Sequence, residues 1–184
     1  PSFQRMAAAR KIIRGHRNSI AVLTGNETEQ ELEKLSDDVF TYFGLGCRNV
    51  SKIYIPKNFE IGRLIRAFNT HENLLINNSK YFNNYEYYKS IYLVNKTPFY
   101  DSGFVMLKKD ESMVSPISVV YFEEYSSQEM LKEKLMELKQ QIQCVVSNNP
   151  FFSEIKLGYA QSPRLNDYAD GIDVLNFCIE MKKK

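Results

Sequence analysis

YFGLGCRNVSKIYIP, residues 42–56, is the stretch of sequence that decides how this chain folds. Apolar residues recur before it at the spacing of one helix face: Leu32, Leu35, Val39 and Phe43. Thr28-x-x-Glu31 forms a capping box at the start of this helix. The β-branched and aromatic run 53–55 predicts a strand that Pro56 ends. The stretch therefore predicts a helix, a glycine-containing turn and a strand in succession.

Cys47 lies in this turn, and the residues around it suit a thiol nucleophile. Gly44 and Gly46 lack the Cβ atoms that would hinder positive φ angles and the approach of a substrate carbonyl to the backbone. The amides beside Cys47 would then be free to stabilise an oxyanion. Arg48 adds a positive charge that favours the thiolate over the thiol. Together with Asn49, these residues form the candidate site loop.

The alternative interpretation of Cys47 is a small buried hydrophobic residue, which is what most free cysteines in intracellular proteins are. Cys144 and Cys178 lie within apolar runs, and we expect both in the core. The turn context sets Cys47 apart from these two residues.

The rest of the chain alternates between strand-like and helix-like segments. Strands are predicted at 19–24, 103–107, 117–122 and 143–147. Helices are predicted at 61–68, at 81–94 and after a Ser126-x-x-Glu129 capping box, with one face made by Leu131, Leu135, Leu138 and Ile142. The asparagine-rich stretch 77–84 predicts a long turn. We therefore expect an α/β fold with a mostly parallel sheet that helices flank on both faces.

Composition excludes several classes of protein. The 184 residues, 43% hydrophobic, suit one domain spanning 1–184 with a real core. A net charge of +2 is too balanced to predict a nucleic-acid partner. No apolar run reaches the roughly 18 residues that span a bilayer, and no signal peptide is visible. Three cysteines and two histidines predict neither a disulfide framework nor a metal site, so we expect a soluble protein of the reducing cytoplasm.

At the residues of the turn the chain resembles the aldehyde dehydrogenase superfamily. The nucleophile motif of that superfamily is matched by Gly44, Cys47, Lys52 and Ile55. Lys52 provides the basic residue of the motif, although the family usually has Arg there, and Leu45 stands where the family usually has Gln. The chain is more similar to the acyl-CoA reductase branch, the LuxC-like fatty-acyl reductases. Three blocks carry this resemblance: 14–23, 42–52 and 160–171.

The resemblance implies a fatty acyl-CoA reductase with Cys47 as its nucleophile. Its thiolate would attack an acyl-CoA or another acyl thioester, with the oxyanion met by its own backbone amide. Coenzyme A would leave an acyl-cysteine, which NADPH or NADH would reduce to an aldehyde. The resemblance also implies that two copies pair as a homo-oligomer.

The cofactor is expected to bind mainly to residues outside this chain. Residues 44–49 come within one residue of the dinucleotide fingerprint, but a helix precedes them and a strand follows, which is the reverse of the required order. Ser112 stands where the wider family has a cofactor-binding glutamate, with Glu111 one place away. The 184 residues would then be the nucleophile-bearing half of a longer enzyme, and we expect them to lack reductase activity alone.

Two other functions fit the sequence. One is a cofactor-independent thiol acyltransferase or hydrolase that pairs Cys47 with His71, which requires the imidazole within hydrogen-bond reach of the sulfur. His16, in a basic stretch, is the other imidazole and is interpreted as a surface residue. The second alternative is a non-catalytic remnant domain in which Cys47 is buried.

Overall fold

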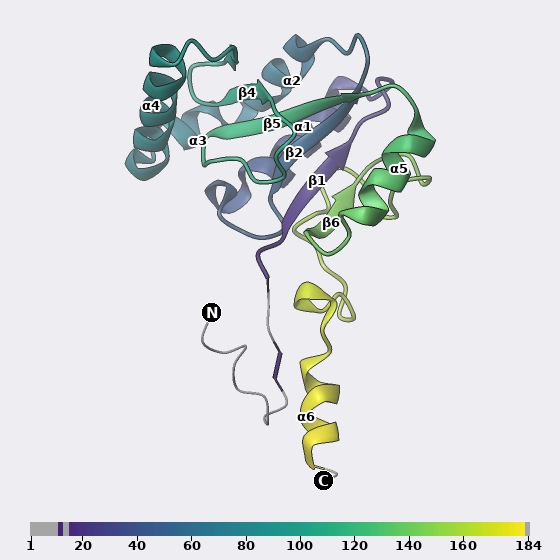
Figure 1. Ribbon diagram of the computed structural model, residues 1–184. Helices are drawn as coiled ribbons and strands as arrows, with labels where there is room; N and C mark the ends of the chain where they lie inside the picture. The colour runs from purple at the N-terminus through teal and green to yellow at the C-terminus, as the bar shows by residue number, and fades with distance from the viewer. Residues whose placement is uncertain (1–10, 13–14, 183–184) are drawn as a thin grey trace.

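The computed structural model describes residues 11–12 and 15–182. Its strands form one sheet in the order β3-β4-β5-β2-β1-β6 (Figure 1). Their bounds are Asn18–Val22 (β1), Val50–Pro56 (β2), Tyr100–Asp101 (β3), Met106–Lys109 (β4), Val119–Tyr125 (β5) and Ile142–Val146 (β6). Only the β3–β4 pair in this sheet is antiparallel. The expected mostly parallel sheet is thus confirmed.

Helices cover both faces of the sheet. They are α1 (Glu29–Phe40), α2 (Ile61–Phe68), α3 (Glu72–Ile76), α4 (Ser79–Val94) and α5 (Gln128–Glu137), whereas α6 (Val174–Lys182) does not pack on the sheet. Alternation along the strands sends Ala21 and Ile53 to the face that α1 and α2 cover, whereas Ile20 packs with α5 on the other face. Tyr85 and Tyr92 of α4 pack on that second face over β4 and β5. These layers make the α/β architecture that the sequence predicts.

The capping box at the start of α1 forms as expected. Glu31 N donates to Thr28 Oγ1 at 3.3 Å, and Thr28 N donates to the Glu31 carboxylate at 2.8 Å. The reciprocal bonds satisfy two backbone donors that the first helical turn leaves without an acceptor. They fix where α1 begins.

Three expectations about α4, α5 and β6 are wrong. The N-cap of α5 is Ser127, which accepts from Met130 N, and not Ser126. Ile142 begins β6 and so does not extend the helix face. The predicted long turn at 77–84 is mostly the first part of α4, because Asn78 accepts a bond from Tyr81 N and caps the helix there.

Lys52 of β2 is a charged residue whose side chain is completely buried. Its ammonium group pairs with Glu123 of β5 at 2.6 Å and donates to the carbonyl oxygen of Glu111 at 2.7 Å. Glu123 also pairs with Lys134 of α5. Burial lowers the pKa of Lys52, while the Glu123 carboxylate opposes that change. The group ties two strands, a helix and the 111 loop together.

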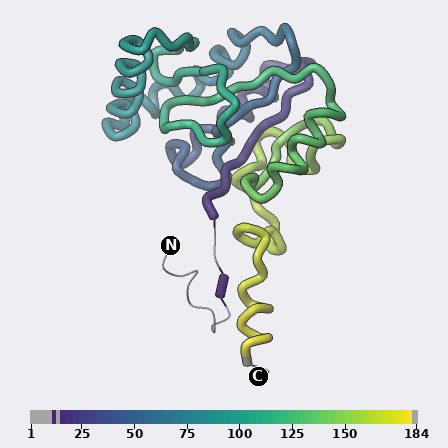
Figure 2. The backbone as a smooth tube through the Cα atoms, viewed as in Figure 1, coloured from purple at the N-terminus to yellow at the C-terminus, as the bar shows by residue number. Residues whose placement is uncertain are grey.

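The last helix, α6, extends away from the sheet at the end where β1 begins (Figure 2). Its exposed apolar side chains include Leu175 and Ile179. In the part of the chain that the structure describes, no helix is both long and apolar enough to cross a bilayer.

Candidate active site

Cys47 lies in the turn between the 3₁₀ segment Thr41–Gly44 and β2, and its side chain is exposed. The turn is at the edge of the sheet where the parallel strands begin. Ser19, near the start of β1, donates its hydroxyl proton to the carbonyl oxygen of Cys47 at 3.0 Å. The loop is therefore fastened to the neighbouring strand, with the thiol left open to solvent. The role of Cys47 as a nucleophile stays a prediction.

The backbone before Cys47 bends through three consecutive left-handed residues. The φ angles are 56° at Tyr42, 59° at Phe43 and 74° at Gly44. Only the glycine adopts such an angle without a steric cost, and each of the other two costs roughly 1–2 kcal/mol. The expectation that Phe43 continues the α1 face is wrong, because α1 ends at Phe40 and the chain reverses its handedness.

Both glycines of the site loop have a local structural reason. Gly44 provides the positive φ angle, as expected. At Gly46 the requirement is space, because a Cβ atom there would lie 2.9 Å from Asn49 Oδ1. Gly46 N donates to that same oxygen at 2.8 Å. The glycines shape the loop, and an effect on substrate approach stays a prediction.

Asn49 is 3% exposed and joins the loop to the end of α1. Its Nδ2 group donates to the carbonyl oxygens of Asp38, Val39 and Thr41, at 3.2, 3.1 and 2.7 Å. Asp38 and Val39 lie in the last turn of α1 and Thr41 is its C-cap, so Asn49 bonds the carbonyl groups at the end of the helix. Asn49 is thus a positioning residue for the loop.

The amide N–H groups of Cys47 and Arg48 have no acceptor among the residues that the structure describes. Their neighbours are bonded: Gly46 N to Asn49 Oδ1, and Asn49 N to the carbonyl oxygen of Gly46 at 3.0 Å. Two donors next to an exposed thiol are what an oxyanion site requires.

Arg48 turns toward the C-terminal part of the chain. Its Nε group donates to the carbonyl oxygen of Ala160. The charge of Arg48 lowers the pKa values of Asp38 and of Cys144, in both cases against a larger raising effect of burial. An effect of Arg48 on the thiol of Cys47 stays a prediction.

Asp38 is a fully buried carboxylate on α1 that the sequence interpretation missed. It accepts from Gly158 N at 2.6 Å and from Ala160 N at 2.8 Å, which holds segment 157–160 against the helix. Burial raises its pKa to about 6, partly opposed by these two hydrogen bonds. The available signal was a charged residue three positions after Leu35, on the apolar face of the helix.

We expect Asp38 to make the free energy of unfolding fall as the pH rises from about 4 to about 6. Its folded pKa lies above the unfolded value of 3.8, so the native state binds more protons in this window. A difference of about two units corresponds to about 3 kcal/mol. Urea unfolding at pH 4, 5, 6 and 7 measures the slope.

Asp38→Asn is expected to flatten that slope, because the amide does not titrate. The exposed Glu33 on the same helix supplies the control, and Glu33→Gln should retain the slope. A slope that survives in Asp38→Asn would assign the proton uptake to another group.

Cys144 is buried in β6, as expected, and its sulfur lies 3.0 Å from Ser19 Oγ. Since the Ser19 proton is donated to Cys47, the Cys144 thiol is the donor in this contact. Burial raises the pKa of Cys144 and keeps it as the thiol. Cys178 is exposed on α6, so the expectation that it belongs to the core is wrong.

His71 is not arranged to serve Cys47. Its Nδ1 atom lies 3.0 Å from Ser36 Oγ and 3.1 Å from Thr70 Oγ1, while Nε2 lies 3.2 Å from an Asp37 carboxylate oxygen. Burial lowers the pKa of His71, and Asp37 partly opposes that change. Both ring nitrogens are therefore occupied away from the sulfur. His16 is exposed.

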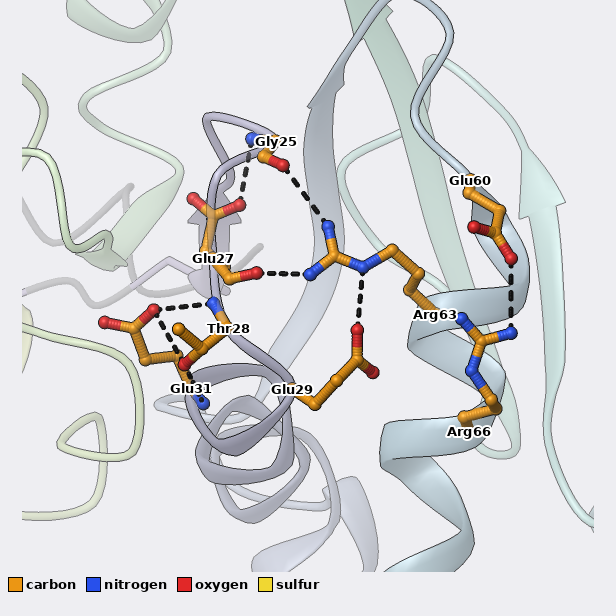
Figure 3. A network of polar contacts seen from close by, with 8 residues as sticks. All are labelled: Gly25, Glu27, Thr28, Glu29, Glu31, Glu60, Arg63 and Arg66. Atoms are coloured by element: carbon orange, nitrogen blue, oxygen red, sulfur yellow. Dashed lines mark hydrogen bonds and ion pairs between the residues drawn. The ribbon is translucent and has the colours of Figure 1, made fainter.

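At the opposite edge of the sheet, the turn from β1 to α1 does not fit a dinucleotide. Glu27 accepts from Gly25 N at 2.9 Å (Figure 3) and from Thr24 N at 2.6 Å. Its carboxylate therefore occupies two backbone donors that a pyrophosphate would need. Arg63 is held by the carbonyl oxygens of Gly25 and Glu27 and by the Glu29 carboxylate. An anion at this turn would meet the negative charges of Glu27 and Glu29.

Known proteins resemble this chain in structure and not in sequence. No family model and no curated protein matches the sequence. Among solved structures, an indole-3-acetaldehyde dehydrogenase in complex with NAD+ is similar at 11% identity and a TM-score of 0.50, over 75% of this chain and 35% of that one. An aldehyde dehydrogenase of Staphylococcus aureus in a substrate-bound state is similar at 13% identity and a TM-score of 0.49, over 78% of this chain and 38% of that one. Aldehyde dehydrogenase 21 of Physcomitrella patens, in complex with succinate, is similar at 10% identity and a TM-score of 0.48, over 85% of this chain and 42% of that one.

The first of these structures shows that the chain has an aldehyde dehydrogenase-like α/β fold. This chain spans about a third to two fifths of the length of the solved chains it matches. The likeness at such identities concerns the fold alone, and fold does not fix function.

Proposed function

We propose that this chain is the nucleophile-bearing domain of an aldehyde dehydrogenase-like oxidoreductase, and more narrowly of a fatty acyl-CoA reductase. The observation that carries the proposal is the exposed thiol of Cys47 on a bent loop, next to two backbone N–H groups without an acceptor in the described part of the chain. The resemblance of segments 42–52 and 160–171 to acyl-CoA reductases supports the narrower assignment.

The reaction assigned to this domain is acyl transfer. The Cys47 thiol gives its proton to solvent, and the thiolate forms a bond to the thioester carbonyl carbon. The oxyanion that results is stabilised by the N–H groups of Cys47 and Arg48. When the carbonyl re-forms, the carbon–sulfur bond to coenzyme A breaks, coenzyme A leaves as a thiolate and takes up a proton, and an acyl-Cys47 thioester remains.

The reduction that would follow, with NADPH or NADH, is assigned to residues outside this chain. In the strand-to-helix turn considered above, residues 24–28, the Glu27 carboxylate occupies the N–H groups of Thr24 and Gly25. We therefore expect the chain alone to form the acyl-enzyme without oxidising NADPH or NADH.

The alternative of a Cys47–His71 acyltransferase has less support, because both imidazole nitrogens lie against Ser36, Thr70 and Asp37. The alternative of a remnant domain requires a buried Cys47, and the thiol is exposed. Acyl transfer from a thioester is the function that the geometry supports best.

Incubation of the chain with octanoyl-CoA tests this proposal. Intact-mass measurement should show the addition of one octanoyl group, and peptide mapping should locate it on Cys47. Hydroxylamine should remove the group, as it does from thioesters. Absence of an adduct, or an adduct that maps to Cys178 instead, would reject the assignment of Cys47.

A further inference from the structure

A cavity of about 380 Å³ lies at the edge of the sheet where β1, β2 and β6 begin. Three cationic side chains line it, one from the segment that enters each strand: Arg17, Arg48 and Lys139. The strands lie next to one another in the order β2-β1-β6, so the three entering segments are neighbours in space. The C-terminal residues 166–168 and 171 close another side of the cavity.

The lining of the cavity carries an excess of positive charge. The lining contains three cations and one carboxylate, that of Asp167. The Asp167 carboxylate already accepts a hydrogen bond from Arg164 N at 2.9 Å. Among the described residues, neither Arg17 nor Lys139 has an ion-pair partner. A cavity lined in this way attracts anions, and charge in a recess is screened by salt less than charge on an open surface.

Two polar groups in the lining are buried without a hydrogen-bond partner in the described part of the chain. They are Arg48 Nη2 and Gln143 Oε1. The bond from Arg48 Nε to the carbonyl oxygen of Ala160 fixes the plane of the guanidinium. A buried guanidinium N–H without an acceptor is unfavourable, and it is relieved by an oxyanion, for which the planar arginine fork is well suited. Gln143 Oε1 requires a donor, such as a ligand hydroxyl.

We propose that this cavity binds the phosphate group of a phosphomonoester, with Arg48 as the oriented donor and Arg17 and Lys139 as additional charge. A phosphomonoester offers both the acceptor oxygens that Arg48 lacks and, when singly protonated, the hydroxyl that Gln143 lacks. The site is separate from the thiol of Cys47, which is not part of the cavity lining. The proposal therefore stands independently of the acyl-transfer function.

Titration of the chain with sodium phosphate at low ionic strength, followed by calorimetry, tests the site. We expect saturable binding of one phosphate, and at least about tenfold weaker binding in Arg48→Gln, because a charge-assisted bond is removed. Arg66→Gln is the matched control, since Arg66 pairs with Glu60 on α2, and it should bind like the wild type. Absence of saturable binding at about millimolar phosphate would overturn the proposal.

Two further variants keep the test decisive if Arg48→Gln does not fold, which circular dichroism detects. Arg17→Gln and Lys139→Gln remove cations that have no side-chain partner in the described part of the chain, and each should weaken phosphate binding severalfold. Wild-type affinity in both of these variants would overturn the site. Cys47→Ser should bind phosphate normally, which separates this site from the acyl-transfer proposal.

The same titration with 3′,5′-ADP, the nucleotide portion of coenzyme A, distinguishes two sources of the phosphate. Binding at least about tenfold tighter than that of inorganic phosphate would assign the site to coenzyme A. Equal affinity would show that the site recognises the phosphate group alone. In both cases the Arg48→Gln effect must appear, and binding that ignores this substitution rejects the site.

Discussion

Cys47→Ser is expected to abolish the acyl adduct formed with octanoyl-CoA. A serine hydroxyl without a neighbouring base stays protonated and is a far weaker nucleophile than a thiolate. The side chain at position 47 is exposed, so the substitution should change the free energy of unfolding by less than about 0.5 kcal/mol. Intact-mass measurement detects the adduct, and circular dichroism verifies the fold.

Cys178 offers a matched control for this prediction, because it is also exposed. Cys178→Ser should leave the adduct unchanged. In variants that each retain one cysteine, iodoacetamide should label Cys47 faster than Cys178, and both faster than the buried Cys144. An equal rate at positions 47 and 178 would mean that the loop does not activate the thiol.

Asn49→Ala is expected to lower the free energy of unfolding by about 4 kcal/mol, the largest stability effect we predict. The side chain is 3% exposed, and its loss removes the acceptor of Gly46 N and the donor that bonds the carbonyl oxygens of Asp38, Val39 and Thr41 at the end of α1. Each unsatisfied buried group costs about 1–3 kcal/mol. Urea unfolding monitored by circular dichroism gives the value.

Asn26→Ala is the control for Asn49→Ala. Asn26 is exposed, and among the described residues its side chain has no hydrogen bond, so the change should be within about 0.5 kcal/mol. Asn49→Asp provides a second comparison. The carboxylate still accepts from Gly46 N but brings its charge against three carbonyl oxygens, so it should not rescue stability. A stable Asn49→Asp variant would show that the acceptor role alone matters.

The order of helices and strands could be predicted because it depends on local patterns. The spacing of Leu32, Leu35 and Val39 and the Thr28–Glu31 capping box predict α1 without reference to any distant residue. The mostly parallel sheet follows from the alternation of such elements. Errors occur where two neighbouring residues can each cap a helix. Ser127, and not Ser126, caps α5.

The surroundings of the candidate site could be predicted only in part. The exposed turn around Cys47 follows from its glycines, but the roles of Asp38 and Ser19 depend on residues that are distant in sequence. The Asp38 carboxylate accepts a hydrogen bond from Ala160 N, and the Ser19 hydroxyl contacts the Cys144 sulfur on the neighbouring strand β6. Cys178 was misplaced because an apolar run predicts burial only when another element covers it.

The left-handed bend at Tyr42 and Phe43 makes the position of the thiol depend on the rest of the molecule. The residues of the bend favour a right-handed continuation of α1. Packing and the Asn49 hydrogen bonds hold them in the left-handed conformation instead. If the Asn49 hydrogen bonds broke, α1 would gain a turn and Cys47 would move away from Ser19. Loss of reactivity would then precede unfolding during gentle heating or mild denaturation.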